Sequence, residues 1–141
     1  VSEERLHIVP NPIVSLGALP NRAEVRERMH RDQAIPLEDP LVIYPVRCIR
    51  RKNIGEMLLW SAVFNHRVSF GNTLAPRNVA EQPAYDRWRS LAKDLKLPCY
   101  FELGEAFSFK ENLSAADALI TTSVAEGFGM ESGYDNWVSQ P

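Results

Sequence analysis

Short apolar runs of strand length alternate with segments of helical periodicity along this chain, and that alternation constrains its fold more than any other feature. The runs lie at residues 6–9, 41–46, 68–74, 99–103 and 118–124. Parallel strands need long crossover connections, which are usually helical and right-handed. The order β-α-β-α-β-α-β-α-β therefore predicts a three-layer α/β fold, in which a Rossmann-like parallel sheet carries helices on both faces.

Four helices are expected between the runs, at about residues 22–31, 54–66, 80–96 and 109–116. Asn21 is the expected N-cap of the first helix, with Glu24 three residues later completing a capping box. Trp60 and Trp88 fall on helical faces, so we expect both in the core. The pair Gly71-Asn72 interrupts its apolar run, which indicates a bulge or an early turn.

Composition and charge narrow the class of function. The chain has 141 residues, which suits one domain, and its formal net charge of −2 offers no global basic field for nucleic acid. No apolar run approaches the roughly 18 residues of a membrane helix, and the start lacks a secretory signal pattern. We therefore expect a cytoplasmic protein without a membrane span or a nucleic-acid partner. Since the chain begins with Val1, we also expect a processed chain or part of a longer one.

The titratable residues offer little support for a metal site. Cys48 and Cys99 lie in apolar runs and form no CxxC motif or Cys/His cluster. We expect them to be two buried, reduced thiols. His7, His30 and His66 have no ligand spacing and are expected to be structural.

Ligands of open parallel sheets bind outside the carboxyl ends of the strands. Lys and Arg gather at one such end, where Arg47, Arg50, Arg51 and Lys52 follow a buried run. Arg47 and Lys52 could converge on a diphosphate, because Arg offers a bidentate fork and Lys a mobile point charge. The alternative is a solvated basic turn. Arg77 follows another strand end and could line the same cleft.

A second segment at this edge is VAEGFGM, residues 124–130, where two glycines bracket an aromatic residue at an expected helix start. Glycine lets the backbone approach a ligand closely, and a helix N-terminus suits a phosphate or sugar oxygen. Glu126 would accept hydrogen bonds from sugar hydroxyls; the alternative is an ordinary strand-to-helix turn. The chain lacks GxGxxG, GxxxxGK[ST] and GxSxG, which disfavours dinucleotide binding, a P-loop and a hydrolase elbow.

Four segments, in this order and spacing, resemble the retaining glycosyltransferases with two Rossmann-like domains, the GT-B architecture. They are HIVPNP (7–12), VIYPVRCIRRKN (42–53), ENLSAADALITTS (111–123) and VAEGFGM (124–130). The first is similar to the start of the family's C-terminal domain, and the second to a strand that is followed by Arg, four further residues and Lys. The third is similar to the family's penultimate helix and strand, and the fourth to its donor-sugar loop.

The resemblance implies a donor-binding domain over residues 1–130 that binds a nucleotide-diphosphate sugar for glycosyl transfer to an unknown acceptor. It implies that Arg47 and Lys52 hold the diphosphate and stabilise the leaving nucleotide, and that Glu126 contacts the sugar; these are the expected catalytic residues. The backbone N–H groups expected to bind sugar or phosphate oxygens belong to Gly127, Phe128, Gly129 and Met130. Members of this family usually need no metal, and no cofactor is expected.

Residues 131–141 depart from the family pattern as a polar tail. Tyr134 stands where the family has a second Glu for the nucleotide ribose, and Glu131 is out of register. The apolar helix expected next and the acceptor domain are both missing, so we expect the isolated chain to be inactive. It could form a homo-oligomer through surface that truncation exposes. Two alternatives remain, a non-catalytic Rossmann-like fragment with no tight ligand and a phosphosugar isomerase or epimerase.

Overall fold

A four-stranded parallel sheet forms the centre of the computed structural model, which describes residues 15–64 and 67–124. The strand order is β3-β2-β1-β4. The strands are β1 (Leu41–Arg47), β2 (Ser69–Leu74), β3 (Cys99–Tyr100) and β4 (Ala118–Leu119). The predicted α/β class is therefore confirmed. The strand expected at residues 6–9 and the segments 125–130 and 131–141 lie outside the described residues.

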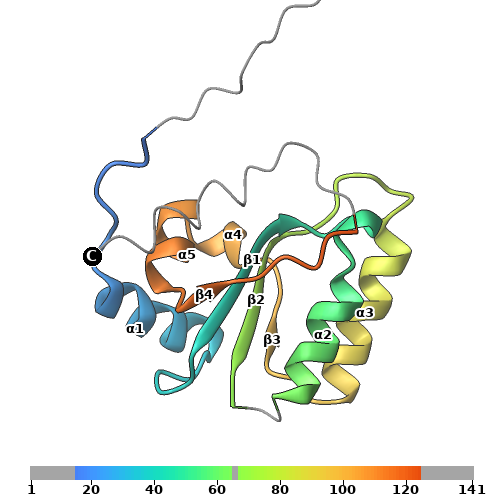
Figure 1. The fold of residues 1–141 in the computed structure, drawn as a ribbon, viewed down its shortest axis with the longest axis horizontal. Helices are drawn as coiled ribbons and strands as arrows, with labels where there is room; N and C mark the ends of the chain where they lie inside the picture. Colours follow the sequence, from blue (N-terminus) through green and yellow to red (C-terminus); the bar gives the residue numbers. More distant parts are fainter. Residues whose placement is uncertain (1–14, 65–66, 125–141) are drawn as a thin grey trace, which may run out of the picture.

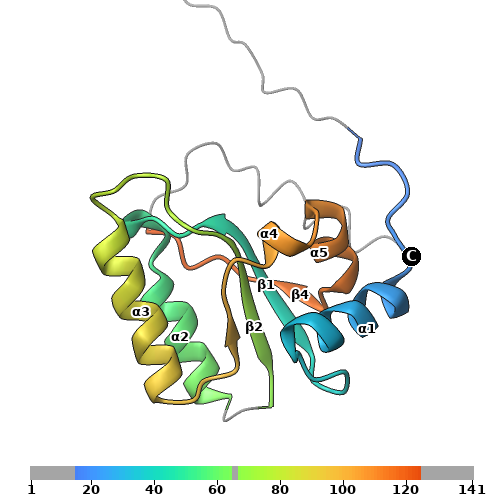
Figure 2. The same ribbon diagram turned by 180° about the vertical axis from the view of Figure 1, so that it is seen from behind.

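Helices cover both faces of the sheet (Figures 1 and 2). On one face lie α1 (Arg22–Gln33), α4 (Leu103–Ala106) and α5 (Phe109–Ala115), and on the other α2 (Ile54–Val63) and α3 (Gln82–Asp94). A short 3-10 turn, η2 (Arg50–Lys52), joins β1 to α2. The predicted first helix and its N-cap are confirmed, because the Asn21 side chain accepts hydrogen bonds from the amides of Ala23 and Glu24. The contacts of the described residues do not include the return bond from the Asn21 amide to the Glu24 side chain, so the expected capping box is only half formed.

Strand β1 supplies both halves of the core. Leu41 and Ile43 belong to the cluster under α1 and α5, whereas Tyr44 and Val46 belong to the cluster under α2 and α3. Burial on both faces explains why this strand is a continuous apolar run instead of an alternating one. The register of pairing with β2 shifts near Pro45. Tyr44 pairs with Asn72 and Arg47 pairs with Leu74, so β1 has one more residue than β2 over this stretch, which is a β-bulge. The bulge falls at a proline, which has no N–H to donate to the sheet.

The pair Gly71-Asn72 does not interrupt β2, so the expected bulge or early turn there is wrong. Gly71 is needed for a close approach between layers. A Cβ atom at this position would lie 2.5 Å from Cδ1 of Leu103 and 2.9 Å from Cδ1 of Ile43. The missing side chain makes room for α4 against the sheet.

The last two strands are shorter than the apolar runs predict. The chain leaves β3 after Tyr100, and Glu102 adopts a left-handed conformation, φ 63°, that turns it into α4. After Leu119, Ile120 makes one more backbone contact with Ile43, and the chain then turns towards η2. Tertiary contacts at the carboxyl edge thus end both strands early.

Trp60 and Trp88 are not core residues, contrary to the prediction. Trp60 is 42% exposed and Trp88 is 37% exposed. The sheet-facing side of α2 consists of Ile54, Met57, Leu58 and Ser61, and helical periodicity turns Trp60 away from it. Trp88 lies across the contact between the two helices, since a Cβ atom at Gly55 would be 2.7 Å from its ring.

Candidate functional site

The basic turn, defined here as Arg47 and residues 50–52, lies at the carboxyl edge of the sheet, as predicted. Arg47 ends β1, and its Nη1 donates to the carbonyl of Ala75 at 2.7 Å. Arg50 and Arg51 are exposed, whereas Lys52 is only 7% exposed. Sequence reasoning located Arg47 and Lys52 at the right edge but did not foresee the burial of Lys52. Glu126 and the segment Gly127, Phe128, Gly129 and Met130 lie outside the described residues.

The segment after β4 packs directly on this turn. The Thr122 hydroxyl donates to the carbonyls of Lys52 and Asn53, each at 3.0 Å. The Val124 amide donates to the carbonyl of Arg51 at 2.9 Å. The last described residue before the segment 125–130 therefore contacts the basic turn, although some 70 positions separate the two in sequence.

A carboxylate from the loop before α3 already contacts the basic turn. The Arg50 amide donates to Oε2 of Glu81 at 3.0 Å. Backbone N–H groups of this kind bind anions, so Glu81 occupies a position that a ligand phosphate or carboxylate could take. Arg77 is exposed in the loop that leads to Glu81.

Asn72 is a residue of this edge that sequence reasoning missed. It is fully buried, and its Nδ2 donates to Sγ of Cys48 at 2.7 Å while its Oδ1 accepts from the Glu102 amide at 3.3 Å. Glu102 in turn accepts from the Tyr85 hydroxyl at 2.8 Å. These bonds join β1, β2, β3 and α3 behind the basic turn. An amide side chain inside an apolar strand run was the available signal, because buried polar groups require partners.

The two cysteines are free thiols. Cys48 is buried, as predicted, and burial raises its pKa to about 12. Cys99 is partly buried, and burial raises its pKa to about 11. Because only the thiolate is a strong nucleophile or metal ligand, neither side chain is prepared for that chemistry near neutral pH. Among residues 15–64 and 67–124, no three His, Cys, Asp or Glu side chains gather in a metal-binding group.

A groove of about 590 Å³ lies away from the basic turn, along the edge strand β3. Sequence reasoning missed it, because it depends on which strand ends the sheet. Of the described candidate residues, neither Arg47 nor Lys52 lines it.

These features define an α/β protein with a Rossmann-like parallel sheet and a basic turn at the carboxyl edge of that sheet. No protein-family model matches the chain, and no curated protein matches it significantly in sequence. In the part of the chain that the structure describes, no helix has both the length and the apolar character needed to cross a membrane.

Proposed function

We propose that this chain is the donor-binding domain of a GT-B glycosyltransferase and binds a nucleotide-diphosphate sugar at the carboxyl edge of its sheet. The observation that carries the proposal is the contact between Val124 and Arg51. It brings Val124, the first residue of the VAEGFGM segment, to the basic turn, and both of these sequence segments resemble parts of the same family's donor site.

The chemistry of the basic turn fits a diphosphate. Among the described residues, Ala75 accepts from one of the five N–H donors of Arg47, so its guanidinium retains donors for phosphate oxygens. The positive charges of Arg47 and Lys52 would stabilise the negative charge that develops on the leaving nucleotide. Glu126 would accept from sugar hydroxyls, and the amides of residues 127–130 would bind sugar or phosphate oxygens.

The proposal predicts that a nucleotide sugar raises the midpoint of thermal unfolding. UDP-glucose, GDP-mannose and ADP-glucose are the probes, and a matching donor at 100 times its Kd would add about 2.7 kcal/mol to the free energy of unfolding. The Arg47→Ala/Lys52→Met variant should lose at least about a hundredfold in affinity by calorimetry, since hydrogen bonds to charged groups contribute about 1.5–3 kcal/mol each. Methionine keeps most of the volume of the buried lysine stem.

Arg67→Ala is the control, because Arg67 is exposed at the opposite, amino-terminal end of β2. Its affinity for the donor should equal that of the unmodified chain. Unchanged affinity in the Arg47→Ala/Lys52→Met variant would contradict the diphosphate assignment.

A second candidate is a non-catalytic Rossmann-like domain that assembles with copies of itself. The exposed apolar side of α2, formed by Leu59, Trp60, Val63 and Phe64, favours this function. The thermal-shift measurement separates the two candidates, because an assembly domain without a ligand shows no shift with any of the three sugars.

A further inference from the structure

The groove along β3 lies between α3 and the C-terminal end of α1. One wall carries Arg89, Lys93 and Lys96 from α3 and the residues just after it. Gln33, at the end of α1, stands on the opposite side, and residues 99–101 form the floor. Strand β3 is a terminal strand of the described sheet, so the groove runs along an open edge.

The backbone of β3 offers hydrogen-bonding groups to this groove. The carbonyl of Pro98 accepts from the Phe70 amide at 2.8 Å, and the Glu102 amide reaches Asn72 of β2. Residues 98, 100 and 102 therefore direct their backbone groups towards β2. Because these directions alternate along a parallel strand, the Cys99 carbonyl and the Phe101 amide face the open edge.

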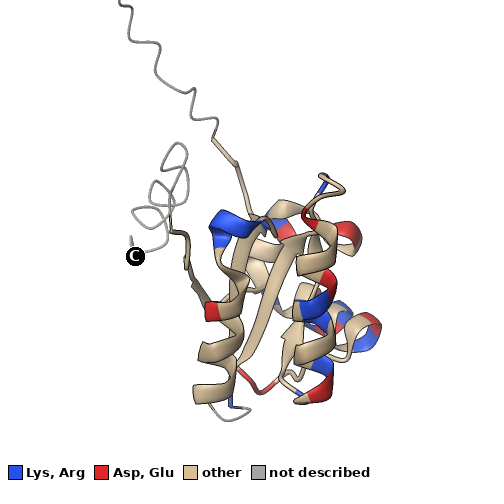
Figure 3. Ribbon diagram, turned by 90° about the vertical axis from the view of Figure 1, so that its right-hand side faces the viewer, with Lys and Arg blue, Asp and Glu red and all other residues tan. Residues whose placement is uncertain are grey.

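The wall above this edge is positively charged. Arg89 forms a 3.3 Å ion pair with Glu102, whereas Lys93 and Lys96 have no ion-pair partner among the described residues. Asp86 is the acidic residue of the lining, and it accepts a hydrogen bond from Gln82 of its own helix. Figure 3 shows the basic and acidic residues of α3 beside the nearly uncharged α2.

The spacing of the cations suits an extended chain. Arg89 and Lys93 are four residues apart, which is about 6 Å along a helix. Alternate side chains on one face of a strand are separated by about 6.6 Å. Successive same-face carboxylates of an added strand would therefore meet successive cations of α3.

We propose that the open edge of β3 binds an extended acidic peptide segment as a fifth strand. Its backbone pairs with the Cys99 carbonyl and the Phe101 amide, which is a recognised mode of peptide binding. Its alternate Asp or Glu side chains pair with Arg89, Lys93 and Lys96. The site is separate from the basic turn, none of whose residues lines the groove.

The test uses a fluorescent peptide of alternating Glu and Val, titrated with the 141-residue chain at low salt and followed by anisotropy. We expect saturable binding that weakens as salt is added. The Lys93→Glu/Lys96→Glu variant should bind at least about tenfold more weakly, because two attractions become repulsions. The Arg87→Glu/Lys110→Glu variant makes the same change in charge at exposed residues outside the groove and should bind within about twofold of the unmodified chain.

A second peptide isolates the backbone pairing. It has the same sequence with an N-methyl group on every backbone amide, which removes the N–H donors from both edges of an added strand and leaves its charge unchanged. We expect this peptide to bind at least about tenfold more weakly. Equal binding of the two peptides would overturn strand addition. Absence of saturable binding would overturn the whole proposal. Lys93 and Lys96 would then be explained as charges that prevent edge-to-edge aggregation through β3.

Discussion

The hydroxyl of Tyr44 is a polar group in the centre of the core. The side chain is fully buried between β1 and the α2–α3 layer. Among the described residues no hydrogen bond reaches its oxygen. An unsatisfied buried hydroxyl costs roughly 1–3 kcal/mol in protein mutational data, so this position lowers the stability of the fold.

Replacing Tyr44 with Phe should therefore raise the free energy of unfolding, by about 1 kcal/mol, because the ring is kept and only the unsatisfied oxygen is lost. Urea unfolding measures the change. Tyr85→Phe is the matched control, since the Tyr85 hydroxyl donates to Glu102 at 2.8 Å and its removal should lower stability. A loss of stability in both variants would show that the Tyr44 hydroxyl does have a partner.

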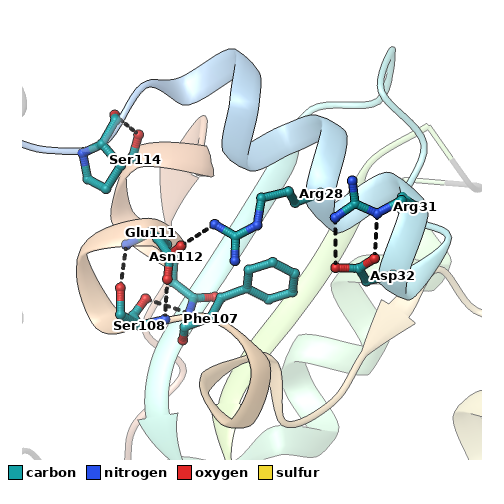
Figure 4. Close-up of polar contacts among 9 residues, drawn as sticks. Arg28, Arg31, Asp32, Phe107, Ser108, Glu111, Asn112 and Ser114 are labelled. Carbon is teal, nitrogen blue, oxygen red and sulfur yellow. Dashed lines mark hydrogen bonds and ion pairs between the residues drawn. The ribbon is translucent and has the colours of Figure 1, made fainter.

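A single carboxylate, Glu111, both caps helix α5 and links it to α1. Ser108 and Glu111 form a reciprocal capping box at the start of α5. Arg28 of α1 pairs with the same Glu111 and lies 5.4 Å from the centroid of the Phe107 ring (Figure 4). The loss of Glu111 would therefore weaken both the helix start and the contact between the two helices.

Stability should depend on pH through this carboxylate. Hydrogen bonds from the Ser108 side chain and backbone, followed by Arg28, lower the pKa of Glu111 from 4.5 to about 2. Because the folded-state pKa is the lower one, the stabilisation is complete above about pH 4.5 and is lost as the pH falls towards 2. Urea unfolding across this range should show a smaller loss of stability for Glu111→Gln than for the unmodified chain.

Glu105→Gln, an exposed acid on α4, is the control for this pH series and should follow the unmodified chain. If the free energy of unfolding fell equally with pH in Glu111→Gln and in the unmodified chain, the ionisation of Glu111 would not be coupled to folding through the capping box and Arg28.

The elements differ in how well the sequence predicted them. The ends of α1 and α5 lie close to the expected positions, because caps such as Asn21 act within a few residues. Strands β3 and β4 are shorter than their apolar runs, since pairing with a neighbour decides where a strand ends. At the candidate site, the position of Arg47 could be predicted from the strand end, whereas Lys52 is buried in a turn that contacts residues after β4, which are distant in sequence.

At the scale of the whole molecule, α2 is buried on one side and apolar on the other. Glu56 is its single charged residue, and Figure 3 shows the helix almost free of charge. Leu59 and Val63 are 62% and 63% exposed, one helical turn apart. An apolar stripe of this kind on a surface helix is typical of an interface between proteins.

We expect the chain to self-associate through this side of α2. Light scattering at high protein concentration should give a mass above the 16.0 kDa of the monomer. Leu59→Glu/Val63→Glu should restore the monomer mass, because burying two carboxylates in an interface is costly. Val79→Glu changes an isolated apolar residue that is 86% exposed and should leave the mass unchanged. A monomer at every concentration would contradict this prediction.

The sequence by itself determined the α/β class, the places of the main helices and the edge at which the basic turn lies, because periodicity and capping act over short distances. Only the tertiary structure decided the strand order β3-β2-β1-β4, and with it the open edge beside Lys93. It also decided that Val124 reaches Arg51 and that Asn72 joins Cys48 to Glu102. Such contacts join residues far apart in the chain, and they follow from how the layers pack, which local patterns do not specify.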